Sequence, residues 1–96
     1  MNTQEQRERD RAIKQAIISL AGSYDQRIDC NLRMAKIYLM LGNRDYLNNS
    51  IIEANEALEE ARGRLGPEFA RVLDNRVLAF IEEHHGQMVD LARRAA

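Results

Sequence analysis

The segment best suited to chemistry is residues 82–85, two glutamates followed by two histidines. On a helix, Glu82 and His85 share a face because residues three apart are neighbours. A Glu-x-x-His pair is the spacing with which some helical bundles hold two metal ions, but those sites also need inward-facing carboxylates from other helices. The carboxylates of residues 45–61 lie off the apolar stripe of their own segment. We therefore expect no metal site and keep a metal-binding helical bundle as an alternative.

Cys30 is the only cysteine, so it cannot form a disulfide within the chain, which is typical of a reducing compartment. A reactive thiol needs an electropositive and partly open setting, whereas Cys30 falls on an apolar stripe with no histidine near it in sequence. We expect it to be buried and structural. The chain also lacks a phosphate-binding glycine loop, a zinc-spaced cysteine and histidine set, and a serine elbow. We therefore predict that the protein is not an enzyme, with no cofactor and no small-molecule substrate.

The 96 residues correspond to a single helical domain, residues 1–96, and their net charge is −1. Contact with phosphates normally needs a basic surplus, so this charge argues against a nucleic-acid binder, and a nucleic-acid-associated regulator is kept as an alternative. Residues 1–10 are too polar for a secretory signal, and no apolar run approaches the ~20 residues that span a bilayer. We expect a cytoplasmic protein without membrane contact.

The elements that carry these residues are helices. Thr3 followed by Gln6 matches a capping box, which places the first helix start there. Apolar residues then recur every three or four positions, at Ile13, Ile17, Leu20, Tyr24, Ile28, Leu32, Ala35 and Leu39. Either one helix runs from about residue 4 to 41 or two helices meet at Gly22, and we favour a bend or break at this glycine.

Two glycines mark the later helix ends. Gly42 suits a left-handed cap, and Asp45 can cap the helix that follows. That helix has the spacing of a short coiled-coil seam, at Leu47, Ile51, Ala54, Leu58, Ala61 and Leu65. Gly66 then ends it, and Pro67 opens the next helix at the position that proline prefers.

The last helix has an apolar face formed by Phe69, Leu73, Val77, Phe80, His84, Met88 and Leu91. His84 is therefore expected to be packed or at an interface, and His85 to be exposed. Gly86 interrupts the pattern, and a separate short helix over residues 87–95 is an alternative. The fold class we predict is all-α, an elongated three- to four-helix bundle of antiparallel helical hairpins.

The segment 28–41 carries a second apolar stripe. At about 100° per residue, Cys30, Met34, Ile37 and Leu41 lie roughly opposite to Ile28. A helix with two opposed apolar stripes must be covered on both sides. Three interpretations stay open: this is the central helix of a monomer, the surface of a homodimer, or the binding site of a different protein.

Charges are distributed unevenly along the chain. Residues 45–61 hold five carboxylates and no lysine or arginine, whereas residues 24–44 and 62–77 each have a local charge of +2. The acidic helix either lies between its basic neighbours in one bundle or presents an acidic ridge, Glu53, Glu56 and Glu60, to a basic partner protein. The charged residues before Ile13 alternate in sign, as on a solvated helix face.

About a quarter of the chain, with Ala35, Tyr38, Gly42, Ala54, Ala57 and Leu58, resembles the helix–turn–helix register of a tetratricopeptide repeat. The resemblance of residues 35–58 implies a helical hairpin and a role in binding proteins or peptides.

From these patterns we predict a non-enzymatic protein–protein interaction module, a small regulator, inhibitor or adaptor that self-associates as a homodimer. The residues expected to bind the partner are Cys30, Met34, Ile37, Leu41, Glu53, Glu56 and Glu60.

Overall fold

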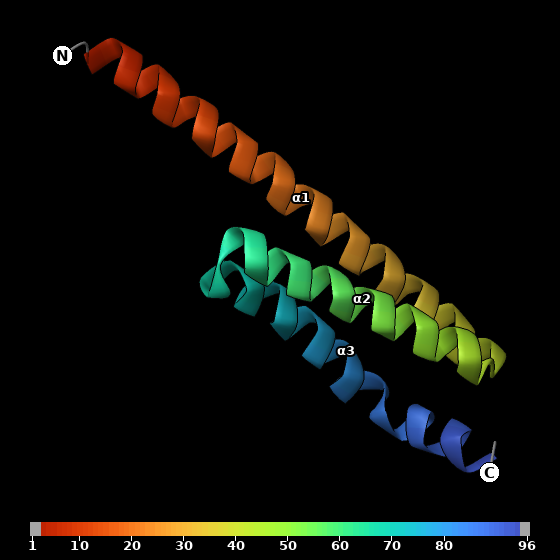
Figure 1. The fold of residues 1–96 in the computed structure, drawn as a ribbon. Helices are drawn as coiled ribbons and strands as arrows, with labels where there is room; N and C mark the ends of the chain where they lie inside the picture. Colours follow the sequence, from red (N-terminus) through yellow and green to blue (C-terminus); the bar gives the residue numbers. More distant parts are fainter. Residues whose placement is uncertain (1–2, 95–96) are drawn as a thin grey trace.

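Three helices joined by very short turns make up the fold (Figure 1). The computed structural model describes residues 3–94, in which α1 spans Thr3–Leu41, α2 spans Arg44–Leu65 and α3 spans Pro67–Arg94. The prediction of an elongated all-helical bundle is confirmed with three helices, and the described part of the chain contains neither a strand nor a fourth helix. The Cα trace extends 67 × 18 × 18 Å, and its radius of gyration is 17.9 Å. A compact chain of this length would have a radius of about 12.5 Å.

The preferred break at Gly22 is wrong, because α1 continues through this residue for 39 residues in all. No neighbouring side chain lies within 4 Å of the place where a Cβ of Gly22 would stand, so no close contact requires a glycine at this position. A glycine costs a helix only ~1 kcal/mol, which the flanking turns tolerate. Similarly, α3 continues through Gly86 to Arg94, so the alternative of a separate helix over residues 87–95 is also wrong. Residue 95 of that range lies outside the described residues. The helix α1 includes Thr3 itself rather than beginning after it.

The turn between α1 and α2 consists of two residues with overlapping roles. Gly42 has a φ of 71°, as predicted for a left-handed cap, and the Asn43 N–H donates to the carbonyl of Tyr38 at 2.9 Å. The same Asn43 then caps α2, since its side-chain oxygen accepts a hydrogen bond from the Tyr46 N–H at 3.1 Å. The expected cap at Asp45 is therefore wrong, and this residue lies inside the first turn of α2.

The turn between α2 and α3 is Gly66 alone, as predicted. Its φ of 92° is accessible to glycine at little cost, and its N–H donates to the carbonyl of Arg62 at 3.1 Å. Pro67 is the first residue of α3, where its missing N–H leaves no helical hydrogen bond unmade.

The core follows the seams between the helices in two clusters. The larger is built from Tyr24, Ile28, Ala57, Leu58, Ala61, Ala70, Leu73 and Val77, and the smaller from Ala35, Leu39, Leu47 and Phe80. Late residues of α2 lie in the cluster with Tyr24 and Ile28, and the early residue Leu47 lies in the cluster with Ala35 and Leu39. This order agrees with Figure 1, where α2 returns along the second half of α1. The apolar stripe predicted for α2 is thus used within the chain, and Ser50 and Ala57 are buried beside it.

Candidate interaction surfaces

The first 17 residues of α1 have no cover. Every residue from 3 to 19 is exposed, and burial begins only at Leu20. Figure 1 shows this part of α1, in red and orange, extending beyond the ends of α2 and α3. We call residues 3–19 the N-terminal arm. It carries three isoleucines, Ile13, Ile17 and Ile18, whose exposed fractions are 53%, 49% and 63%.

Sequence reasoning missed this arm because its apolar spacing is the same as that of the covered part of α1. A signal was nevertheless present in the lengths. At 1.5 Å per residue, the 39 residues of α1 extend about 58 Å, whereas the 22 residues of α2 extend about 33 Å. Once residues 4–41 are taken as one helix, the second helix cannot reach the first 15 or so residues.

The second stripe, Cys30, Met34, Ile37 and Leu41, is mostly exposed. Ile37 is 47% and Leu41 is 73% exposed, while Met34 is half-buried. Cys30 is exposed, so the prediction of a buried structural cysteine is wrong. The reason is that α2 and α3 both pack on the Tyr24 and Ile28 side of α1, which leaves the opposite side without a neighbour. The second stripe is therefore available to a partner rather than part of the core.

The acidic ridge, Glu53, Glu56 and Glu60, lies on the outer face of α2, and all three residues are exposed. Beside it is an open groove of about 620 Å³ lined by Ile52, Asn55, Glu56, Glu59 and Glu60. Ile52 is 52% exposed and forms the apolar part of this groove. The groove has an apolar centre at Ile52 and glutamates along its edges, a combination that suits a basic amphipathic helix.

One carboxylate of the ridge is already paired. Arg27 of α1 donates a hydrogen bond to Glu60 at 2.9 Å, as expected for an acidic helix beside a basic neighbour. This contact lowers the pKa of Glu60 and raises that of Arg27. Among residues 3–94, Glu53 and Glu56 form no ion pair, so the local neutralisation of the acidic helix is incomplete.

The cations of the arm are also without ion-pair partners within the described chain. They are Arg7, Arg9, Arg11 and Lys14, four positive charges in eight residues. By contrast, Arg76 of α3 pairs with Asp25 in the packed half of α1, just beyond the end of the arm. The same arm also carries three exposed carboxylates, Glu5, Glu8 and Asp10, which leave it with a net charge of +1, whereas residues 45–61 carry carboxylates and no lysine or arginine.

The two histidines differ in their surroundings. His84 is half-buried, with its ring centroid 4.5 Å from that of Phe80 and its Nδ1 3.3 Å from Oε1 of Gln87, as expected for a packed histidine. Glu82 and His85 are both exposed. Within residues 3–94, no group of three or more histidine, cysteine, aspartate or glutamate side chains lies close enough together to hold a metal ion.

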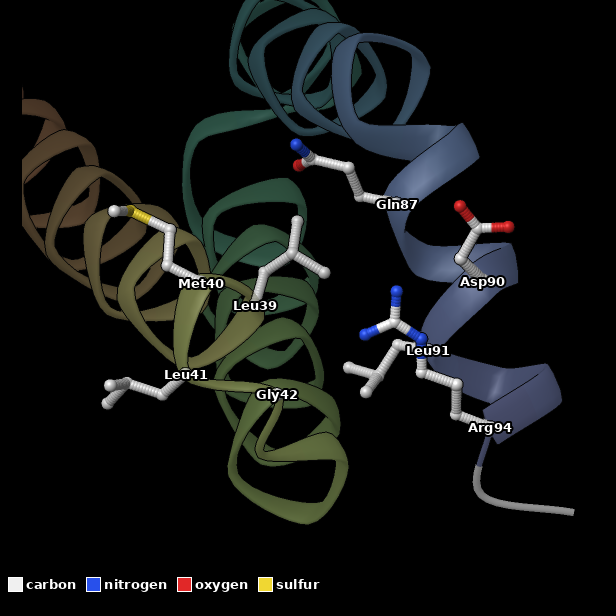
Figure 2. A pocket seen from close by; sticks show the side chains of 8 residues that line it. All are labelled: Leu39, Met40, Leu41, Gly42, Gln87, Asp90, Leu91 and Arg94. Carbon is white, nitrogen blue, oxygen red and sulfur yellow. The ribbon is translucent and has the colours of Figure 1, made fainter.

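A cavity of about 350 Å³ separates the end of α1 from the end of α3 (Figure 2). Leu39 and Leu91 lie on either side of it, while Met40 and Leu41 point away into solvent. The polar residues that line the α3 side, Gln87, Asp90 and Arg94, are all exposed. The cavity therefore resembles a packing gap at the end of the bundle more than a ligand site.

Among residues 3–94, no helix combines the length and the apolar character needed to cross a membrane. The chain matches no family model, and it matches neither a curated protein nor a solved structure.

Proposed function

We propose that this protein is a non-enzymatic protein–protein interaction module, a small cytoplasmic regulator, inhibitor or adaptor that also associates with itself. The observation that carries the proposal is the N-terminal arm, a preformed helix with Ile13, Ile17 and Ile18 on its surface. Apolar side chains grouped on an exposed helix mark interaction surfaces in soluble proteins. The resemblance of residues 35–58 to a tetratricopeptide hairpin supports the same function, because that family binds proteins and peptides.

Self-association is tested by size-exclusion chromatography with light scattering over a range of protein concentrations. We expect the mass to rise from 11.1 kDa towards twice that value as the concentration reaches the high micromolar range. A protein that remains an 11.1 kDa monomer throughout would remove self-association from the proposal.

Binding to other proteins is tested by affinity capture from the native host with a matched control. The double variant Ile13→Asp with Ile17→Asp removes the apolar surface of the arm, and because both positions are uncovered it should leave the fold intact. We expect a partner that the wild type retains and the variant loses. Identical sets of captured proteins would contradict a role for the arm.

A nucleic-acid-associated regulator is the second candidate, favoured only by the four cations of the arm, which Glu5, Glu8 and Asp10 on the same arm largely offset. A fluorescence binding assay with short duplex and single-stranded oligonucleotides, performed at moderate salt, decides it. The net charge of −1 leads us to expect no affinity.

A further inference from the structure

We infer that the arm of one chain binds the acidic outer face of α2 in a second copy, and that two copies do so reciprocally. The inference rests on the proposed self-association and adds the two surfaces that meet. Its three supports are the continuity of the apolar stripe, the matching lengths of the two surfaces, and their opposite unpaired charges.

The arm continues the face of α1 that already packs on α2. Tyr24 and Ile28 on this face are 2% and 0% exposed, because α2 and α3 cover them. Ile13 and Ile17 lie on the same face two to four turns earlier and have nothing to cover them. A helix placed against the arm on this side would extend the contact that α1 makes with its own α2.

A second copy supplies such a helix if the two α1 helices run antiparallel. Each α2 is then enclosed between its own α1 and the arm of the other chain. The lengths fit, since the 17-residue arm extends about 25 Å and α2 extends about 33 Å. The arrangement has twofold symmetry, so both contacts form at once and neither surface remains free to bind a third chain.

The charges on the two surfaces are complementary. Relative to Ile17, Arg9 lies about 80° to one side of the apolar stripe and Lys14 about 60° to the other, at 100° per residue. On the outer face of α2, Ile52 is accompanied by Glu53 and Glu56, which have no ion pair within residues 3–94. Arg7 also lies about 80° from Ile17, and Asp10 lies about 20° from it, on the stripe itself. The side of the arm that carries the stripe therefore has three cations and one carboxylate, a net charge of +2 opposite the carboxylates beside Ile52.

The size of the contact predicts a dimer of modest affinity. Each chain contributes its arm and its acidic face, two strips about 25 Å long and about 10 Å wide. Together they cover roughly 500 Å² in projection on each chain, below the ~800 Å² per partner of a stable complex. We therefore expect dissociation in the micromolar range and a strong dependence on salt.

Charge reversal provides the test. An arm variant combines Arg9→Glu with Lys14→Glu, and a ridge variant combines Glu53→Lys with Glu56→Lys. None of these side chains forms an ion pair within residues 3–94, so each variant should keep the circular dichroism spectrum and melting temperature of the wild-type monomer. Arg11→Glu is the matched control, since Arg11 lies on the same arm but about 120° from Ile17.

Dissociation constants from sedimentation velocity at low salt give the outcome. We expect each double variant to weaken the wild-type dimer by at least about tenfold, because attraction becomes repulsion at both contacts. The control Arg11→Glu should change it by less than about threefold. Mixing the arm and ridge variants in equal amounts should restore wild-type affinity, since each reversed arm then meets a reversed ridge.

Each of the other results overturns the inference in a different way. A wild-type dimer that neither double variant weakens forms through another surface, such as the second stripe, and leaves the proposed self-association intact. Weakening without restoration on mixing means that the arm and the ridge do not meet each other. A wild type that never dimerises removes both this inference and the self-association. If the wild type does not dimerise but binds an acidic peptide or a nucleic acid, the arm serves a different partner.

Discussion

Replacing Ile28 and Ile17 with alanine, one at a time, compares a covered and an uncovered position on the same face of α1. Ile28 is 0% exposed, and removing a fully buried isoleucine side chain costs about 2–5 kcal/mol of unfolding free energy, because a cavity remains. Ile17 is 49% exposed, and alanine is the better helix former by about 0.4 kcal/mol. We therefore expect Ile28→Ala to lose about 3 kcal/mol and Ile17→Ala to change stability by less than about 0.5 kcal/mol.

Urea denaturation followed by circular dichroism measures both values, at a protein concentration well below the expected dissociation constant of the dimer, so that the monomer dominates. A loss for Ile17→Ala close to that for Ile28→Ala would mean that the arm is packed in the monomer, and the reasoning about exposed surfaces would be wrong. Amide hydrogen exchange provides an independent check on the same protein. The arm should exchange much faster than the part of α1 from Tyr24 to Leu39, because its hydrogen bonds open without disturbing the core.

Three further predictions concern the turn, the ion pair and the second stripe. Asn43→Ala should lower stability by about 1 kcal/mol in urea denaturation, because the Tyr46 N–H loses its acceptor, and Asn43→Asp should retain the cap. The Arg27 contact lowers the pKa of Glu60 in the folded state below its ordinary value of 4.5. The stability that this contact contributes is therefore complete above pH 4.5 and is lost as the pH falls through the lower folded-state pKa. Glu60→Gln should abolish this part of the pH dependence of the unfolding free energy, measured by urea denaturation at several acidic pH values. Ile37→Asp should leave both the melting temperature and the dimer nearly unchanged, because Ile37 is exposed and lies outside the proposed contact, and loss of the dimer would assign self-association to the second stripe.

The sequence predicted the parts of the fold that local chemistry determines. Gly42 and Gly66 end helices because each takes a positive φ that other residues adopt at a cost, and Pro67 can begin a helix but not continue one. The core stripe of α2 was also predictable, since its apolar spacing allows one buried face. In each case a single strong preference acts without competition from the rest of the molecule.

Predictions failed where two local solutions are close in energy. The cost of one glycine in a helix, ~1 kcal/mol, is too small to decide from the sequence whether α1 breaks at Gly22, and the helix is continuous there. Asn43 and Asp45 are both good caps, and the choice depends on the hydrogen bond that Asn43 makes to the end of α1. Cys30 was assigned correctly to a second stripe, but whether that stripe is covered depends on where α2 and α3 lie.

The arm shows why exposure of a helix matters for binding as well as for stability. An isolated helix of 17 residues is marginal in water because its nucleation is unfavourable, but here the packed half of α1 supplies the nucleus. The arm extends from that nucleus at a small cost per residue, so a partner meets a helix that is already formed and loses little affinity to ordering it. Truncating the arm should therefore remove association while leaving the core clusters intact, whereas weakening the core around Tyr24 and Ile28 should damage both, since the arm would lose the nucleus that keeps it helical.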